Sequence, residues 1–358
     1  MAIQTTVPTR TPEGTGVADS GLLISRLSKN LGGRTIVDAF DLSIRHGELL
    51  ALLGPSGCGK TTTLRMIAGF LEPDTGSVLI DGRDVTTLGP EKRPSAMVFQ
   101  NYALWPYLSV FKNVAFPLTL KRLPRAEVRD RVMAALETVN LAHHKDSRPA
   151  HISGGEQQRA ALARAIVQEP ELLLLDEPLS NLDAKLRVRV REEIREIQQR
   201  LAITTVMVTH DQEEALAISD RVAVMNEGRI EQVSTPSELY ANPQTRFVAS
   251  FIGSMNFLTG ADLGAARVAG APDPDAAESA DVWAVRPEDV TFASTGGGPA
   301  EVRRVLPHGH FAELVVDIDG LSIRSIVTGA VPAVGERGSL ELRNVRHYRN
   351  GLLEGAVA

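Results

Sequence analysis

The sequence has little of several features that define particular classes of protein. Its 358 residues include one cysteine, Cys58, which excludes an internal disulfide and fits a reducing compartment. Aromatic residues make up only 4% of the chain and the formal net charge is -6, whereas nucleic-acid-binding domains usually carry a basic stripe. No uninterrupted apolar run approaches the roughly 18 residues that a membrane-spanning helix needs. We therefore predict a cytoplasmic chain that neither spans a membrane nor binds nucleic acid.

The pattern along the chain predicts a tail followed by two domains. Residues 1–20 are rich in Thr, Gly and Pro and lack the apolar centre of a signal peptide, so we expect a flexible tail. In residues 21–245, apolar runs typical of strands alternate with amphipathic helices, which predicts a mainly parallel sheet covered by helices. Residues 246–358 differ: beyond a loop expected at Gly264–Asp281, the pattern predicts a smaller all-β domain.

Periodicity places several of these elements. Amphipathic helices are expected at Ala126–Asn140 and at Leu186–Leu201, because apolar residues recur there at helical spacing. In the second domain, Leu314–Ile318 and Leu321–Ile326 flank Asp319-Gly320, the D-G pair of a tight hairpin turn.

A glycine-rich loop stands between a predicted strand and a predicted helix. The stretch from Gly54 to Thr61 reads GPSGCGKT and matches G-x-x-x-x-G-K-[ST], the phosphate-binding loop of nucleoside triphosphatases. It follows the apolar run Leu49–Leu53 and precedes a helix expected at Thr61–Ala68, which is the context that the motif requires. The backbone N–H groups of such a loop and the helix N-terminus bind phosphate. We therefore predict a nucleoside triphosphate ligand, with Lys60 on its outer phosphates and the Thr61 hydroxyl on Mg²⁺.

Two acids follow a second predicted strand. The apolar run Leu172–Leu175 is followed by Asp176 and Glu177, at the carboxyl end of the strand, where doubly wound sheets bind their ligands. Asp176 can hold the Mg²⁺ that Thr61 contacts, and Glu177 can accept a proton from an attacking water. The alternative is that both acids are solvated loop residues, but the phosphate loop upstream favours the first interpretation.

Four further motifs carry a resemblance to a known family. Ile152–Arg159 reads ISGGEQQR, and at this point the chain resembles the ATP-binding cassette (ABC) family, whose signature loop lies just upstream of the second acidic strand. Gln100 resembles the family's Q-loop, Ser180–Asp183 its D-loop and His210 its switch histidine. Taken singly, Gln100 could be a surface amide and His210 a satisfied histidine at a strand end. The resemblance covers about residues 21–245, and several ordered motifs are more specific than one.

The resemblance implies a fold and a set of nucleotide-binding residues. The fold is an α/β P-loop NTPase with a RecA-like core, an antiparallel β subdomain and a helical subdomain at about residues 101–160. In this family two cassettes meet head to tail, so that each ATP lies between the phosphate loop of one and the signature loop of the other. The implied contacts to ATP come from Gly54, Pro55, Ser56, Gly57, Cys58, Gly59, Lys60, Thr61 and Thr62 within one chain, and from Ser153, Gly154, Gly155 and Asp183 at the dimer interface.

The same resemblance implies the division of chemical roles. Gln100 and Asp176, with Thr61, belong to the network around Mg²⁺ and water. Glu177 polarises the attacking water, and His210 fixes the γ-phosphate end. The expected cofactors are ATP and Mg²⁺.

Three positions depart from the family pattern or add to it. Leu31 stands where family members usually place an aromatic residue against adenine, which predicts modest affinity for ATP. Glu156 replaces the usual glutamine of the signature loop, and with Ser153 it also forms an S-x-x-E capping box, so both interpretations can hold. Cys58 lies among N–H donors, where the pKa of a thiol tends to fall; the alternative is a small residue that fills a tight turn.

Other segments resemble the importer subclass of the family. Asn101–Pro106 and Thr209–Ala215 carry this resemblance, and Val285–Asp289 resembles the transport-associated OB-like domain appended to such ATPases, for which a regulatory role is expected. In this subclass the helical subdomain offers a groove to a helix of a separate permease. Trp105 and Tyr107 are candidate groove residues, with a buried-core role for Trp105 as the alternative.

The resemblance therefore implies the ATP-hydrolysing subunit of an ABC import system. Tyr102–Pro106 and Phe251–Asn256 are most similar to polyamine, ferric-iron and aminoethylphosphonate systems. The implied partners are a second copy of the chain, an integral membrane permease and, indirectly, a solute-binding protein, with the subunit peripheral at the cytoplasmic face of the inner membrane. The alternative, from another class, is a soluble regulatory or repair ATPase.

Overall fold

The computed structural model describes residues 20–260, 262 and 281–357. Most of the expected tail at residues 1–20 and of the expected loop at Gly264–Asp281 lies outside these described residues. The chain divides into two compact units, Met1–Pro236 and Ser237–Ala358. The division therefore comes earlier in the chain than the boundary expected between residues 245 and 246.

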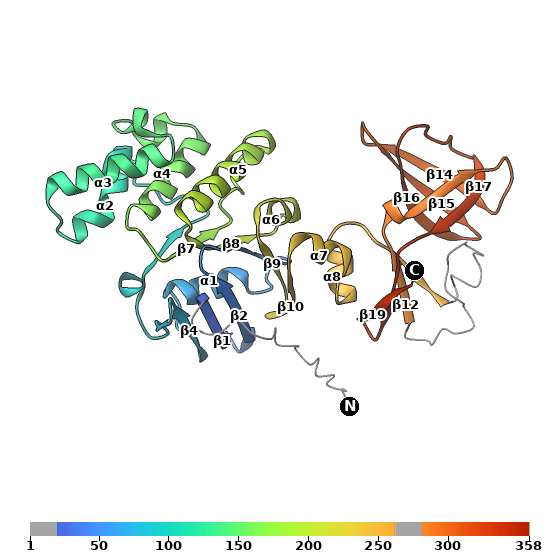
Figure 1. Ribbon diagram of the computed structural model, residues 1–358, viewed down its shortest axis with the longest axis horizontal. Coiled ribbons are helices and arrows are strands. Elements are labelled where there is room, and N and C mark those ends of the chain that lie inside the picture. Colours follow the sequence, from blue (N-terminus) through green and yellow to red (C-terminus); the bar gives the residue numbers. More distant parts are fainter. Residues whose placement is uncertain (1–19, 261, 263–280, 358) are drawn as a thin grey trace. The chain divides into compact units, whose positions relative to one another are not determined.

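The first unit is built on a six-stranded sheet in the order β10-β9-β3-β8-β7-β6 (Figure 1). All neighbouring strands are parallel except β10, which pairs antiparallel with β9 at one edge. β3, β7 and β8 are buried along their whole length, as expected for a parallel sheet that is covered on both faces. The strands are β3 (Leu49–Leu53), β6 (Ser95–Val98), β7 (Leu172–Asp176), β8 (Thr204–Thr209), β9 (Arg221–Asn226) and β10 (Arg229–Ser234).

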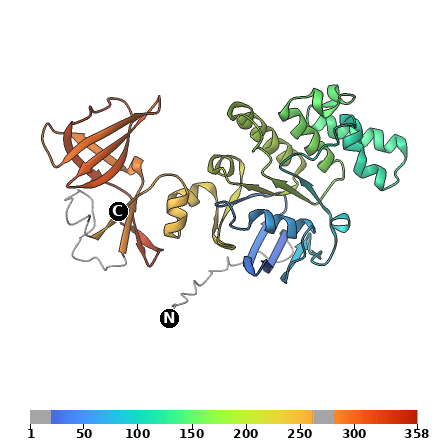
Figure 2. The same cartoon turned by 180° about the vertical axis from the view of Figure 1, so that it is seen from behind.

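Helices cover both faces of this sheet. α1 (Lys60–Ala68) and α5 (Ala184–Leu201) lie on opposite sides of it in both views (Figures 1 and 2). α5 buries Val190, Ile194 and Ile197 on one face, which confirms the helix expected from periodicity. The short helix α6 (Gln212–Ile218) follows β8 and also contacts β3.

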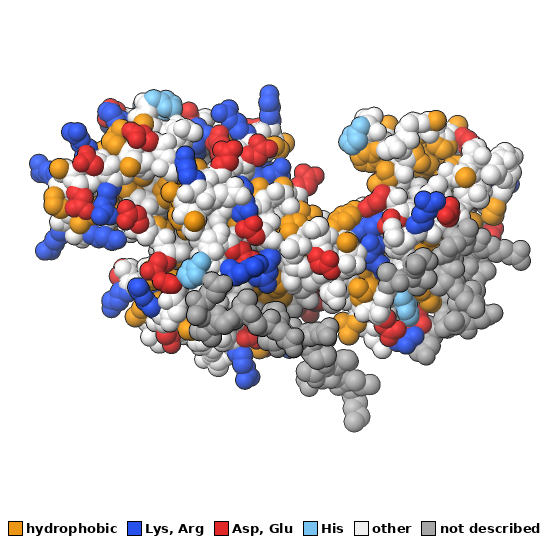
Figure 3. Space-filling view, viewed as in Figure 1, with side chains coloured by type: hydrophobic (Ala, Val, Ile, Leu, Met, Phe, Trp, Pro, Cys, Tyr) orange, Lys and Arg blue, Asp and Glu red, His pale blue; other side chains and the backbone are white. Residues whose placement is uncertain are grey.

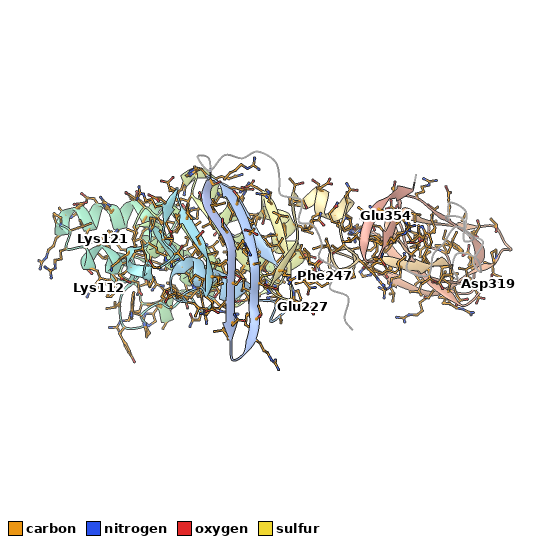
Figure 4. All side chains as sticks on the ribbon, turned by 90° about the horizontal axis from the view of Figure 1, so that it is seen from below. Lys112, Lys121, Glu227, Phe247, Asp319 and Glu354 are labelled. Atoms are coloured by element: carbon orange, nitrogen blue, oxygen red, sulfur yellow. The ribbon has the colours of Figure 1, made fainter. Side chains whose placement is uncertain are left out.

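A second sheet of the first unit is antiparallel, in the order β2-β1-β4-β5. β1 (Ser20–Leu31) and β2 (Arg34–Arg45) form the long hairpin at the front of Figure 4, and β4 (Thr75–Ile80) and β5 (Arg83–Asp84) extend it. Side chains of this sheet, of α1 and of the six-stranded sheet form one hydrophobic core. Because α1 is packed between two sheets, the loop in front of it has a fixed position.

Three helices form the remaining layer of the first unit. α2 (Val110–Leu120), α3 (Arg125–Thr138) and α4 (Gly154–Ile166) pack on one another, within and just beyond the range expected for a helical subdomain. Lys112 of α2 and Lys121 directly after it are exposed to solvent (Figure 4). Basic and acidic side chains are interspersed over the visible face of this unit (Figure 3). Among the described residues, no helix has both the length and the apolar character needed to cross a bilayer.

In its described residues the second unit is built mainly from two antiparallel sheets, next to the short helices α7 (Pro236–Ala241) and α8 (Arg246–Phe251), and these strands confirm the predicted all-β character. β11 (Asn256–Thr259), β12 (Asp281–Val285), β18 (Val345–Arg349) and β19 (Leu352–Val357) form one sheet. The other, in the order β13-β17-β14-β15-β16, is formed by β13 (Val290–Ser294), β14 (Ala300–Pro307), β15 (Ala312–Ile318), β16 (Leu321–Val327) and β17 (Arg337–Leu342).

The five-stranded sheet of this unit curls on itself. Its end strands β13 and β16 contact each other although they are not paired, which agrees with the partly open barrel of an OB-like domain. The hairpin predicted at residues 314–326 is β15–β16, and Asp319 at its tip has φ 51° while Gly320 has φ 88°, as a D-G turn requires (Figure 4).

A buried arginine attaches the short helices α7 and α8 to these sheets. The Arg286 guanidinium is 1% exposed, donates hydrogen bonds to the carbonyl oxygens of Tyr240 (2.9 Å) and Ser254 (3.0 Å), and lies 4.0 Å from the Tyr240 ring centroid. Tyr348 Oη donates to the Pro243 carbonyl at 2.8 Å. These contacts place residues 237–245 in the second unit.

Candidate functional site

The glycine-rich loop joins buried strand β3 to α1. Gly57 and Gly59 have φ angles of 81° and 107°, a region that favours glycine. Gly59 occupies the N-cap position of α1. Among the described residues, no side chain forms a capping hydrogen bond with the N–H groups at this end of the helix. Since the first N–H groups of a helix have no partner inside it, the start of α1 offers donors to an anion.

Two of the loop glycines have no room for a side chain. A Cβ atom at Gly54 would lie 2.2 Å from the Met225 carbonyl oxygen, and one at Gly59 would lie 2.7 Å from the Ile36 carbonyl oxygen. The glycine pattern of the motif therefore reflects close contact of the loop with β9 and β2 as well as its own conformation.

Lys60 lies inside the loop that precedes it. Its side chain is buried, and Nζ donates to the carbonyl oxygens of Gly54 (2.7 Å) and Pro55 (2.9 Å). The ammonium group is thereby held against the loop backbone, where it adds a positive charge to the N–H donors at the start of α1. This arrangement suits a bound phosphate chain.

Thr61 and Asp176 bring two oxygen ligands together. The Thr61 hydroxyl, in the first turn of α1, lies 3.4 Å from Asp176 Oδ1 at the carboxyl end of β7. Burial, and then the neighbouring Glu177, raise the pKa of Asp176, against the opposing effects of Arg65, the Thr61 hydroxyl and Lys60. Hydroxyl and carboxylate oxygens are the hard ligands that Mg²⁺ prefers, so these residues fit a magnesium ion, whose positive charge would stabilise the carboxylate.

Glu177 is held by two residues from other elements. Gln100, which follows β6, donates from Nε2 to Glu177 Oε2 at 3.1 Å, and His210 Nδ1, which follows β8, lies 3.2 Å from Glu177 Oε1. The Glu177 backbone has φ 46°, and its N–H donates to the Val208 carbonyl at 3.0 Å. Three parallel strands thus end beside one carboxylate, and the structure brings together Glu177, Gln100 and His210, to which the resemblance gives separate roles.

An ion-pair network that the sequence analysis missed lies beside this cluster. Arg187, on α5, places Nη1 3.3 Å from Asp211 Oδ2 and Nε 3.6 Å from Glu214 Oε1, and donates from Nη2 to the Leu182 carbonyl at 3.2 Å. Asp211 caps α6 directly after His210. Glu177, Arg187, His210, Asp211 and Glu214 line one small pocket with Ser180 and Thr209. Arg187 therefore connects the D-loop to the segment that carries His210.

The signature residues lie at the start of α4, on a different element. Ser153 is exposed and forms a complete capping box: Glu156 Oε2 accepts from Ser153 N (2.7 Å) and Oγ (2.8 Å). A Cβ atom at Gly155 would lie 3.2 Å from Leu186 of α5, so this glycine permits close packing of the two helices. Within the described ranges, no hydrogen bond joins Ser153, Gly154 or Gly155 to the phosphate loop.

Asp183 also serves as a helix cap. Its Oδ1 accepts from Leu186 N at 3.0 Å at the start of α5, and the neighbouring Asn181 donates to the Gln100 carbonyl at 2.7 Å. Within one chain, the structure therefore joins the D-loop to the Q-loop backbone.

Leu31, at the position expected to face adenine, is 43% exposed at the end of β1, before the turn at Gly32-Gly33.

The expected lowering of the Cys58 pKa is wrong. Cys58 is 5% exposed, and this burial raises the pKa of its thiol above the ordinary value, which outweighs the lowering effect of Lys60. The loop donors that motivated the expectation are present, but the thiol packs among apolar side chains of the core. The alternative of a small residue in a tight turn fits better.

The two aromatic candidates for a docking groove are both exposed. Trp105 is 38% and Tyr107 86% exposed. The Trp105 ring nevertheless packs against Phe116, at a centroid distance of 4.3 Å, and under the Arg164 guanidinium at 5.0 Å. Asn113 bonds both the N–H and the carbonyl of Trp105. Trp105 is thus a fixed surface residue of the α2–α4 layer.

Comparison with known proteins agrees with this geometry. A family model described as "ABC transporter" matches residues 37–180. The spermidine/putrescine import ATP-binding protein PotA of Nitrosomonas europaea is 43% identical over 321 residues, which cover 84% of this chain and 85% of that protein. The PotA of Acidothermus cellulolyticus is 55% identical over 243 residues, 67% of this chain and 63% of its own length. The chain thus spans less than two thirds of some relatives that it matches.

Other relatives and solved structures belong to the same group. The sulfate/thiosulfate import ATP-binding protein CysA 2 of Chromobacterium violaceum is 50% identical over 276 residues, 75% of both chains. The structure of cbiO1 from Clostridium perfringens, part of the ABC transporter complex cbiONQ, has a TM-score of 0.59 and 32% identity over 63% of this chain and 92% of its own. A dimeric ATP-binding cassette in a post-hydrolysis state, bound to ADP and Pi, has a TM-score of 0.53 and 28% identity, and covers 60% of this chain and 98% of that one. With its phosphate loop, acidic strand and signature helix in this arrangement, the chain belongs to the ABC transporter family.

Proposed function

We propose that the chain is the ATP-hydrolysing subunit of an ABC import system. The observation that carries the proposal is the position of the Glu177 carboxylate. Gln100 and His210 hold it next to Asp176, the acid that faces Thr61 directly after the phosphate loop. Phosphoryl transfer asks mainly for positioning and charge neutralisation, and this cluster offers both.

In the proposed mechanism the phosphate loop binds the triphosphate. The N–H groups at the start of α1 and the Lys60 ammonium would hold the phosphate oxygens, and Lys60 would exchange its carbonyl partners in the loop for those oxygens. Thr61 and Asp176, with Gln100, would hold Mg²⁺. The ion would neutralise charge on the β- and γ-phosphates.

Glu177 is the proposed general base. Its carboxylate would take the proton of the attacking water, and the hydrogen bond from Gln100 Nε2 would fix its orientation. His210, 59% exposed and in contact with Glu177 Oε1, can reach the γ-phosphate end of the ligand. The left-handed backbone of Glu177 is tied to β8, so the base has a defined position.

A second copy of the chain is proposed to complete the site. Ser153, Gly154 and Gly155 lie at the N-terminus of α4, where Ser153 is exposed, Gly154 half-buried and Gly155 buried, and Asp183 is exposed at the start of α5. These groups would contact the γ-phosphate and the partner across a head-to-tail dimer. A similar cassette in the comparisons is a dimer with ADP and Pi bound, which supports this proposal.

The proposed cargo is a polyamine, and the proposed partner is a membrane permease. Two relatives are named as spermidine/putrescine import ATP-binding proteins, which favours this cargo over ferric iron or aminoethylphosphonate. The exposed Trp105 and Tyr107 beside α2 offer an apolar contact to a permease helix. The subunit would then lie at the cytoplasmic face of the membrane and respond indirectly to a solute-binding protein.

Reconstitution tests these proposals in sequence. The full chain with Mg²⁺ and ATP should produce ADP; a preparation that makes none, alone and with its permease, contradicts the assigned activity. In proteoliposomes with the permease, spermidine-loaded binding protein should raise ADP production, whereas stimulation by sulfate would point instead to the cargo of the CysA 2 relative. Hydrolysis without association with any permease would favour a regulatory or repair ATPase.

A further inference from the structure

Two histidines and a glutamate meet beside the signature helix. His143 and His144 belong to the short 3-10 turn Ala142–His144, and Glu156 lies in the first turn of α4. One donor atom from each of the three residues lies within 4.8 Å of the other two. None of the three has a place in the ATPase mechanism proposed above.

The spacing of the inner pair suits metal coordination. His144 Nε2 lies 3.3 Å from Glu156 Oε1, and two ligands at the usual zinc distances in a tetrahedron are about 3.4 Å apart. The ring centroids of His143 and His144 are 4.4 Å apart and the rings are tilted by 47°. One nitrogen of the exposed His143 lies within 4.8 Å of the other two donor atoms, so this ring has to move closer to complete the site.

The surroundings orient His144 as a ligand. Its Nδ1 lies 3.2 Å from Ser147 Oγ. A metal at Nε2 leaves the ring hydrogen on Nδ1, where it can donate to that hydroxyl. Outer partners of this kind fix the tautomer and the ring orientation of metal-binding histidines.

The charges near the three residues leave the carboxylate available to a cation. The Lys145 ammonium pairs with Asp146 and the Arg159 guanidinium with Glu193. Glu156 Oε2 is occupied by Ser153, while Oε1 faces His144. A cation at Oε1 would therefore leave the capping box of α4 intact.

We propose that His143, His144 and Glu156 form a binding site for a divalent transition-metal ion of the zinc type. Two imidazole ligands and one carboxylate favour Zn²⁺, or Co²⁺ as its spectroscopic substitute, over Mg²⁺ and Ca²⁺, which prefer oxygen ligands. Water would complete the coordination. The ion would bind Oε1 of the carboxylate whose Oε2 already accepts from Ser153, so it adds positive charge near the signature serine.

Direct metal binding by the full chain tests the site. Titration of the metal-free protein with Co²⁺ alone, followed by its visible absorption, should reveal one tetrahedral ion, which Zn²⁺ displaces. The double variant His143→Asn/His144→Asn should lose this ion. Ser147→Ala should lower the affinity for Co²⁺ by about tenfold, as expected when a ligating histidine loses its hydrogen-bond partner. His151→Asn, which removes an exposed histidine of the neighbouring turn, is the matched control.

Two outcomes contradict the site. Equal binding and equal spectra for the double variant and the parent chain would overturn it, and so would an unchanged affinity in Glu156→Gln. A glutamine at this position still completes the capping box, so circular dichroism and Tm of that variant should match the parent, which separates loss of a ligand from loss of folding.

A kinetic consequence rests on the function proposed above. Positive charge beside Ser153 should favour the γ-phosphate of an arriving nucleotide, so Zn²⁺ should lower the KM for ATP in the parent chain and not in the double variant. An unchanged KM together with intact Co²⁺ binding would overturn this coupling alone. Absence of ADP under all conditions would contradict the ATPase and not the metal site.

Discussion

The two ends of the nucleotide site differ in how the fold holds them. At the phosphate-loop end, Lys60 and Asp176 are 6% and 7% exposed, and their positions are set by buried parallel strands. At the signature end, Ser153 is exposed and its hydrogen bonds go to Glu156 of the same helix turn. The first end is prearranged by the core, at a cost in stability that the raised pKa of Asp176 reflects. The second is a stable helix cap, which would take part in the reaction only in the proposed dimer.

The largest effect expected from disturbing the phosphate-loop end is that of Glu177→Gln. The change keeps the shape of the side chain and removes the proton acceptor, so kcat should fall by about 10²-fold or more. Single-turnover ADP production and gel filtration with ATP should show slow hydrolysis and an accumulated dimer. Glu192→Gln, at an exposed position of α5, should behave as the parent chain, and near-normal turnover in Glu177→Gln would remove Glu177 from this role.

A smaller effect is expected from Arg187→Ala, which cuts the connection between the D-loop and the segment that carries His210. Asp211 and Glu214 would lose their ion pair, and the segment after His210 would be held less firmly. We expect kcat to fall by about tenfold, below the ~10²-fold cost of a 1 Å misplacement of a catalytic group. The KM for ATP should stay constant, and Arg187→Lys should retain more of the parent kcat than Arg187→Ala. An equal loss of kcat in the two variants, with a matching fall in Tm, would indicate that Arg187 has a structural role only.

A change in stability is expected from Asp176→Asn. Because the folded protein raises the pKa of Asp176 above 3.8, it favours the protonated carboxyl, and the free energy of unfolding falls as the pH rises through that raised pKa. The neutral asparagine avoids this loss, so at pH 7 without Mg²⁺ the variant should be more stable by about 1 kcal/mol. Urea unfolding at pH 4 and pH 7 checks this. The free energy of unfolding should differ more between variant and parent at pH 7 than at pH 4. Equal free energies at both pH values would contradict a cost of burying the Asp176 carboxylate.

The smallest effect expected is at Cys58. Its buried thiol with a raised pKa should react slowly with iodoacetamide at pH 7, and the rate should increase as the pH is raised. Mass spectrometry of timed samples measures the rate, with a free cysteine peptide as the reference. Reaction as fast as that of the peptide would mean that the phosphate-loop end opens far more than the structure indicates.

The sequence predicted the phosphate-loop end more fully than the network around it. The loop motif and the acidic strand are local patterns, so their residues and their neighbouring strands could be placed directly. The meeting of Gln100, Glu177 and His210 depended on the family resemblance, because these residues are far apart in the chain and only the strand order brings them together.

Long-range packing decided what the sequence analysis missed. Arg187 is one of several arginines on the polar face of α5, and nothing in its local sequence distinguishes it from Arg189 or Arg191. The Cys58 pKa depends on burial against segments distant in sequence, which outweighs the local donors. The early unit boundary likewise follows from hydrogen bonds of Arg346 and Tyr348 to carbonyl groups about a hundred residues away.

The buried Arg286 limits how the C-terminal part of the chain could be excised. Its guanidinium depends on the ring and the carbonyl of Tyr240, so a fragment that starts at residue 246 would leave a cation in the interior without those partners. A fragment that starts at residue 237 keeps them. Any transplant of this module onto another ATPase therefore has to carry both short helices with it.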